Sequence, residues 1–270
     1  MILFPNAKIN LGLDVLRKRN DGFHDIETVF YPIQLSDVLE INLSEKFAFS
    51  QSGISIDGEA ENNLVVKAYR LLKNEFNLLP VQIHLHKIIP FGAGLGGGSS
   101  DAAFALKGLN QLFHLNLTNK QLEGFASLLG SDCPFFIQNK PIFAEGKGNE
   151  FTHTSISLEG YHLALIKPNV HVPTAVAYSN ITPVAPVVSL MQRLSKGKEN
   201  WRNNVVNSFE SSVFQFYPEV QSIKETLYEM RALYASMSGS GSSVYGIFNE
   251  KPRQIPLALT NYFSWMEELK

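Results

Sequence analysis

The chain has 270 residues, 44% hydrophobic and 18% charged, so it can bury a large core, which excludes a fibrous or disordered protein. Lysine and arginine total 23 against 25 for aspartate and glutamate, so no basic excess is available to neutralise a nucleic acid. The single cysteine, Cys133, excludes an internal disulfide, and no Cys and His spacing indicates a metal site.

Features of a membrane or exported protein are missing from the sequence. No apolar run approaches the length of a membrane span, and residues 1–6 lack the charged and apolar regions of a signal peptide. We therefore expect a cytoplasmic protein that has neither a membrane nor a nucleic acid as partner. The sequence does not indicate an oligomeric state.

The first predicted elements are two strands within residues 9–33, joined by a turn at Asp21 and Gly22. Ile9 and Leu11 alternate with other residues, which predicts that Lys8 and Asn10 project from the opposite face of the strand. A lysine in such a position is ordinarily a solvated surface group. Nothing in this strand alone therefore marks Lys8 as functional.

A glycine-rich loop, residues 90–100, follows a predicted helix over residues 64–76 and a predicted strand from Val81. An alanine-rich helix starting at Ser99 comes next. Glycines let backbone amides approach an anion, and a helix N-terminus adds positive potential, so this junction predicts a phosphate site. The loop lacks the lysine of a Walker A motif and the acidic ribose residue of a dinucleotide site. The alternative is a loop that serves only flexibility.

Thr118 and Gln121 have the spacing of a capping box and predict a helix that Gly130 would stop. Asp132 lies just beyond that stop, where its side chain can point into a cleft. The alternative for Asp132 is an ordinary loop or cap aspartate.

The carboxy-terminal half is predicted to interleave strands and helices. A strand is expected over residues 161–166, a helix from Pro218, and two strands around the small-residue turn 237–243. Residues 183–203 have no assignable pattern. With no low-complexity linker, we predict two closely apposed domains, residues 1–155 and 156–270.

Three segments together are far more specific than any one of them. Residues 5–13, 90–100 and 238–241 resemble, in order and spacing, the three signature motifs of the GHMP kinases. The resemblance implies an α+β, two-lobed fold, with an N-terminal ATP-binding lobe like ribosomal protein S5 domain 2 and a ferredoxin-like C-terminal lobe. It also implies ATP and Mg²⁺ as cofactors. The implied ATP-binding residues are Pro90, Gly92, Ala93, Gly94, Leu95, Gly96, Gly97, Gly98, Ser99 and Ser100.

Further segments resemble one branch of the GHMP kinases: residues 21–28, 130–136, 167–168, 172–174 and 207–210. That branch phosphorylates the 2-hydroxyl of 4-diphosphocytidyl-2-C-methyl-D-erythritol, a cytidine diphosphate-linked alcohol of the non-mevalonate isoprenoid pathway. The resemblance implies this small molecule as the partner. The implied catalytic residues are Lys8 and Asp132, and the implied substrate-binding residues are Asn10, Phe23, His24 and Tyr178.

In this reading Asp132 accepts the proton of the alcohol, and Lys8 either stabilises the transferred phosphoryl group or holds Asp132 ionised. Phe23 stands where the branch usually has tyrosine, so a hydrogen bond through that hydroxyl is absent. The Mg²⁺ ligands are not predicted. The alternatives are a GHMP kinase acting on mevalonate, homoserine or a sugar, and a non-catalytic nucleotide-binding protein on the same fold.

Overall fold

The computed structural model describes residues 1–55 and 58–270, and its chain forms two compact units. Unit 1 comprises Met1–Lys8, Leu35–Phe91 and Gly96–Lys140, and unit 2 comprises Ile9–Gln34, Gly92–Leu95 and Pro141–Lys270. The predicted domain boundary between residues 155 and 156 stays a prediction.

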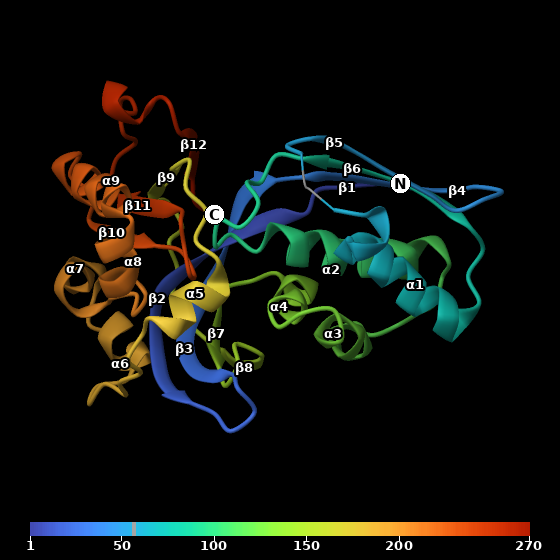
Figure 1. Ribbon diagram of the computed structural model, residues 1–270, viewed down its shortest axis with the longest axis horizontal. Coiled ribbons are helices and arrows are strands. Elements are labelled where there is room, and N and C mark those ends of the chain that lie inside the picture. The colour runs from blue at the N-terminus through green and yellow to red at the C-terminus, as the bar shows by residue number, and fades with distance from the viewer. Residues whose placement is uncertain (56–57) are drawn as a thin grey trace. The chain divides into compact units, whose positions relative to one another are not determined.

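Unit 1 contains a four-stranded sheet in the order β1-β4-β6-β5, in which only the β5–β6 pair is parallel. Helices α1 and α2 pack on one another and lie along one face of this sheet (Figure 1). Its elements are β1 (Ile2–Leu3), β4 (Val38–Leu43), β5 (Ala48–Gly53), η1 (Ala60–Asn62), α1 (Leu64–Phe76), β6 (Val81–Lys87), α2 (Gly97–Leu112), α3 (Asn119–Ser127) and α4 (Cys133–Gln138).

Three predicted local features of unit 1 are confirmed. Along β6, Val81, Ile83 and Leu85 are fully buried and alternate with more exposed residues, as expected for a sheet with one face against helices. The predicted helix over residues 64–76 is confirmed as α1. The capping box of Thr118 and Gln121 is confirmed at the start of α3.

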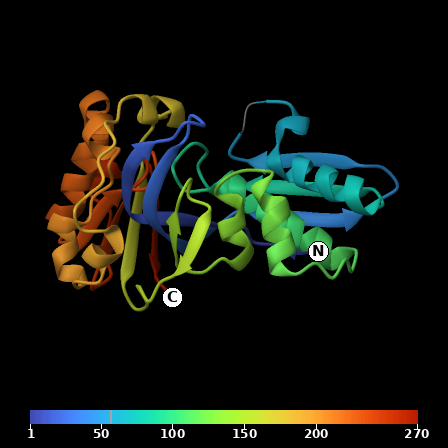
Figure 2. The same cartoon turned by 90° about the horizontal axis from the view of Figure 1, so that it is seen from below.

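Unit 2 holds a second antiparallel sheet, in the order β10-β11-β9-β12, and most of a third, β2-β3-β7-β8. Helix α9 packs on β10 and β11 (Figure 2). The elements are β2 (Asn6–Lys18), β3 (His24–Ser36), β7 (Ile142–Glu145), β8 (Glu150–His153), β9 (His162–Lys167), α5 (Thr174–Ser179), α6 (Leu190–Leu194), η2 (Lys198–Asn200), α7 (Trp201–Asn204), α8 (Glu210–Phe216), α9 (Pro218–Glu229), β10 (Tyr234–Met237), β11 (Val244–Phe248), η3 (Leu257–Leu259) and β12 (Phe263–Glu268).

Two predicted helix boundaries were wrong, and one stretch had no prediction. Helix α2 begins at Gly97 instead of Ser99, because the carbonyl of Gly96 already accepts a hydrogen bond from the Ser100 amide, 2.9 Å away. Helix α3 ends at Ser127, before Gly130. The unassigned residues 183–203 contain α6 and most of α7.

Across the two described ranges of the chain, no helix combines the length and the apolar character that crossing a membrane requires.

Candidate active site

Lys8 lies on β2, which is buried along its first ten residues, Asn6–Val15. Only 3% of Lys8 is exposed, so the surface position expected from the strand pattern is wrong. The reason is that both faces of β2 are covered here, whereas alternation assumes one solvated face. Burial lowers the pKa of Lys8, and the charge of Asp132 opposes that shift.

Asp132 pairs with Lys8 in unit 1, with 3.5 Å between Lys8 Nζ and Asp132 Oδ2. Asp132 occupies the N-cap position of α4, yet its side chain makes no capping hydrogen bond. A capping aspartate normally spends its carboxylate on a helix amide. About a third of the Asp132 side chain (35%) is exposed, so the carboxylate reaches solvent from a buried partner.

The N-terminus of α2 lies beside this pair, within the same unit. Gly96, its N-cap, has a φ of 70°, and a Cβ there would lie 2.9 Å from the Phe136 ring and 3.2 Å from Cγ of Lys8. The buried hydroxyl of Ser100, in the first turn, has no hydrogen-bond partner among the described residues. Unpaired helix amides, a positive dipole end and a spare hydroxyl fit a phosphate group. Unit 1 therefore brings Lys8 and Asp132 to a phosphate-type cradle.

A buried ionic cluster supports this cradle. Nζ of Lys87, at the end of β6, bonds to a carboxylate oxygen of Asp37 and lies 2.7 Å from Oδ2 of Asp101 on α2. The other oxygen of Asp37 accepts hydrogen bonds from the amides of Ile88 and Ile89, at 2.6 and 2.8 Å. The cluster therefore ties the strand that precedes the glycine loop to the helix that follows it. Sequence reasoning missed it, because an isolated buried aspartate leaves no local pattern.

The cluster predicts a pH-dependent stability. Burial raises the pKa of Asp101 to about 8, whereas the two carboxylates together raise the pKa of Lys87 against the effect of burial. Because the folded pKa of Asp101 exceeds its ordinary value, its contribution to stability is full below about pH 4 and is lost as pH rises towards 8.

The variant Asp101→Asn keeps an acceptor for Lys87 but does not titrate. We therefore expect the free energy of unfolding of the variant, relative to that of the wild type, to rise by on the order of 2 kcal/mol between pH 5 and pH 8. Urea unfolding at a series of pH values measures this, with exposed Glu75→Gln as the control. A wild-type-to-variant difference that is constant with pH would contradict the assignment.

In unit 2, the turn between β10 and β11 contacts the first part of the glycine loop. The hydroxyl of Ser238 donates to the carbonyl of Gly94 at 2.8 Å and contacts Oδ1 of Asn10 at 3.4 Å. Nδ2 of Asn10 donates to the hydroxyl of Thr28 at 2.9 Å, and the Tyr245 hydroxyl donates to the Asn10 carbonyl at 2.6 Å. Residues from all three motifs are therefore in direct contact here.

The predicted base-binding residues also meet in unit 2. His24, at the start of β3, stacks on Tyr178 of α5, with ring centroids 4.7 Å apart and 23° between the planes. Tyr178 and Phe209 pack edge to face, with ring centroids 4.7 Å apart and 84° between the planes. Because the two stacked rings touch, a base can enter between them only if they separate. Burial and the charge of Lys18 lower the pKa of His24, which favours a neutral ring with one acceptor nitrogen.

Phe23 precedes this stack and is 53% exposed. Nζ of Lys147, from the turn between β7 and β8, lies 4.7 Å from the centroid of its ring. This cation–π contact needs no hydroxyl, so Phe23 keeps a defined neighbour although it lacks the tyrosine oxygen. Sequence reasoning did not single out Lys147, because one lysine in a glycine turn has no distinguishing pattern.

Comparison with known proteins identifies the family of this chain. The pattern described as GHMP kinases N terminal domain matches residues 63–140, and that described as GHMP kinases C terminal matches residues 189–264. The Bacteroides fragilis protein named 4-diphosphocytidyl-2-C-methyl-D-erythritol kinase is 53% identical to this chain over the full length of both. The protein of the same name from Bacteroides thetaiotaomicron is 55% identical to this chain, over 92% of each.

A solved structure gives the same result. A crystal structure of 4-(cytidine 5'-diphospho)-2C-methyl-D-erythritol kinase aligns with this chain with a TM-score of 0.84 at 29% identity, covering 98% of each chain. The predicted GHMP fold is thereby confirmed. The chain belongs to the GHMP kinases, in the family of the proteins named 4-diphosphocytidyl-2-C-methyl-D-erythritol kinase.

Proposed function

We propose that this protein transfers the γ-phosphoryl group of ATP to the 2-hydroxyl of 4-diphosphocytidyl-2-C-methyl-D-erythritol, in the supply of isoprenoid precursors. The observation that carries the proposal is the Lys8–Asp132 pair beside the N-terminus of α2. A binding protein would need the phosphate cradle but not the carboxylate, so the pair also supports catalysis over a non-catalytic role.

In the proposed reaction Asp132 accepts the proton of the substrate hydroxyl, which makes the oxygen a better nucleophile. Lys8, buried against Asp132, either stabilises charge on the transferred phosphoryl group or keeps the carboxylate ionised. Bound ATP with its Mg²⁺ supplies the phosphoryl group and positive charge on its phosphates. The amides of Gly96 to Gly98 and the hydroxyls of Ser99 and Ser100 would hold those phosphates, with residues 90–95 as the rest of the loop.

No group of three or more His, Cys, Asp or Glu side chains able to hold a metal ion occurs within the described ranges. Mg²⁺ is usually bound through one or two carboxylates together with the phosphates of its nucleotide, so a preformed cage is not required. We therefore propose that the ion enters with ATP.

The cytosine would lie against Phe23, His24 and Tyr178, with Asn10 as a further substrate-binding residue. His24 offers ring nitrogens to the polar edge of the base, and Tyr178 offers an aromatic face. Mevalonate, homoserine and sugars have no base, so the aromatic group favours the cytidine substrate over these alternatives. The cytoplasmic location stays a prediction.

One experiment tests the function directly. Purified protein is incubated with ATP, Mg²⁺ and a panel of alcohols that contains the cytidine substrate, its uridine analogue, mevalonate, homoserine and galactose, and the products are read by phosphorus NMR. We expect a new phosphomonoester with the cytidine substrate alone. Phosphorylation of another member in its place would overturn the substrate, and no product from any member would favour the non-catalytic alternative.

Tyr178→Ala tests the base site. Loss of the stacking face should raise the KM for the cytidine substrate about tenfold, while the KM for ATP changes little. Tyr178→Phe, which keeps the ring, is the matched control and should remain near the wild type. Steady-state kinetics measure both constants. Equal changes in the two KM values for the alanine variant would argue against a cytosine contact at this position.

A further inference from the structure

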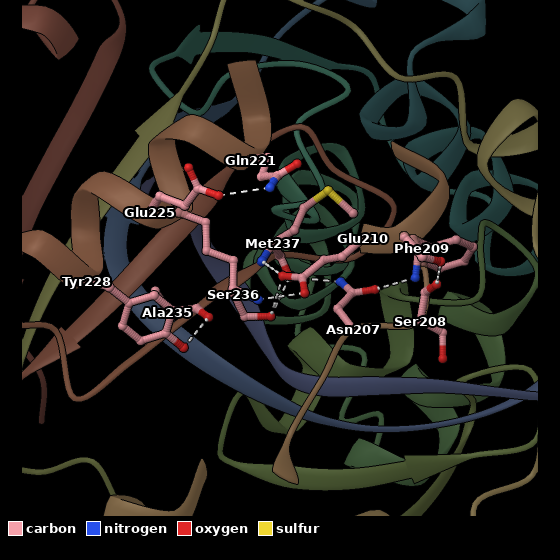
Figure 3. Close-up of polar contacts among 12 residues, drawn as sticks. Asn207, Ser208, Phe209, Glu210, Gln221, Glu225, Tyr228, Ala235, Ser236 and Met237 are labelled. Atoms are coloured by element: carbon pink, nitrogen blue, oxygen red, sulfur yellow. Dashed lines mark hydrogen bonds and ion pairs between the residues drawn. The ribbon is translucent and has the colours of Figure 1, made fainter. Parts of the chain in front are cut away.

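Residues 207–210, here called segment 207–210, hydrogen-bond to the end of β10 and to the β10–β11 turn of unit 2 (Figure 3). Asn207 is 2% exposed and both ends of its amide are engaged. Its Nδ2 donates to the carbonyls of Met237 and Gly239, at 2.8 Å each. Its Oδ1 accepts from the Phe209 amide at 3.0 Å. The side chain therefore has one orientation, with its two donors spent on the turn.

Glu210, at the start of α8, binds the strand that enters the turn. One carboxylate oxygen accepts from the Met237 amide at 2.9 Å and from the Ser236 hydroxyl at 3.2 Å (Figure 3). The other is paired with Lys224 at 2.7 Å. Asn207 and Glu210 thus engage the carbonyl and the amide of the same residue, Met237.

The same segment is anchored to β2. The amide of Ser208 donates to the carbonyl of Leu13 at 2.7 Å, and the amide of Leu13 donates to the carbonyl of Val206 at 2.9 Å. The Ser208 hydroxyl accepts from the Val15 amide at 3.1 Å. The segment is therefore fixed to the strand that carries Asn10, so it can hold the turn at a set distance from that strand.

The β10–β11 turn, held by this segment, hydrogen-bonds to the glycine loop. Ser238 donates to the Gly94 carbonyl, and the amide of Ser243, on the far side of the turn, donates to the Ala93 carbonyl at 3.2 Å. We propose that Asn207 is a positioning residue for phosphoryl transfer, which acts by holding the β10–β11 turn against Gly94. The inference rests on the proposed function, in which that loop binds the phosphates of ATP.

Asn207→Asp tests this residue, because it keeps the shape of the side chain and replaces the donating nitrogen with an oxygen. An ionised carboxylate repels both turn carbonyls, whereas a protonated one still donates to one of them. We expect the Kd for ATP with Mg²⁺ to rise about tenfold at pH 8 and kcat to fall by a similar factor, with little change in the KM for the cytidine substrate. The deficit relative to the wild type should shrink as pH falls.

The selectivity of the deficit, in the Kd for ATP but not in the KM for the cytidine substrate, is the readout that a merely structural role would not move. Asn203→Asp, on the exposed face of α7, makes the same chemical change away from the turn and should match the wild type. Asn207→Ser retains one donor, so its Kd for ATP should lie between those of Asn203→Asp and Asn207→Asp. It serves as the test variant if Asn207→Asp does not fold. Calorimetric ATP binding and circular dichroism accompany the kinetics.

Wild-type ATP affinity and kinetics in the folded Asn207→Asp variant would overturn the proposal, as would a deficit that is independent of pH and equal for both substrates. Failure of the proposed function is distinguishable, since it would show as wild-type protein that does not phosphorylate the cytidine substrate. The ATP-binding comparison between wild type and variant still tests Asn207 in that case.

Discussion

Asp132→Asn is expected to lower kcat by about 10²-fold or more, the usual cost of a lost general base. The amide has nearly the same shape as the carboxylate but cannot take the proton of the acceptor hydroxyl. Because the Asp132 side chain caps no helix amide, its replacement leaves α4 with its hydrogen bonds unchanged. The loss should therefore appear in turnover and not in the fold.

Steady-state kinetics at saturating ATP and cytidine substrate measure this loss in kcat, and calorimetry checks that ATP still binds. Ser131→Ala, at the exposed neighbouring position, is the control and should turn over like the wild type. Removal of the carboxylate also removes the charge that opposes burial at Lys8, so the pKa of Lys8 should fall further. Turnover of the asparagine variant within a few-fold of the wild type would exclude Asp132 as the base.

Gly94→Ala should have the second largest effect. Gly94 has a φ of 74°, and a Cβ at this position would lie 1.9 Å from the backbone oxygen of Ser238. A side chain can rotate away from such a clash, but a backbone carbonyl held by its own turn cannot. We expect the loop and the turn to be forced apart, with a loss of about 2–4 kcal/mol in the free energy of unfolding and a large rise in the KM for ATP.

Gly124→Ala is the matched control, because a Cβ there meets no atom within 4 Å and the residue lies inside helix α3. That change should leave ATP binding unaltered and raise stability slightly, since alanine is the better helix former. Urea unfolding and ATP calorimetry of both variants make the comparison. If Gly94→Ala proved as stable and as active as Gly124→Ala, the contact between turn and loop would have no functional weight.

Regular periodicity in the sequence was sufficient for the elements whose surroundings are simple. Helix α1 has an apolar face against the sheet, and β6 alternates between a buried and a more exposed face, so both were predicted correctly. The capping box of α3 is a local hydrogen-bond pattern and was equally readable. By contrast, β5 (Ala48–Gly53) is an exposed edge strand with almost no buried residue, so it has no hydrophobic pattern to detect.

The site divides in the same way. The three GHMP motifs, the family and the kind of chemistry were contained in the sequence, because each motif is a short run of residues with a characteristic spacing. Tertiary structure decided what those residues face. Lys8 is buried beside Asp132. Asp37 bonds to Lys87, which lies 50 residues further along the chain, just before the glycine loop. Likewise, Asn207 reaches a turn 30 residues away. Contacts between residues so far apart form only when the chain packs. Burial and ion pairing depend on the same packing, so no local sequence pattern predicts them.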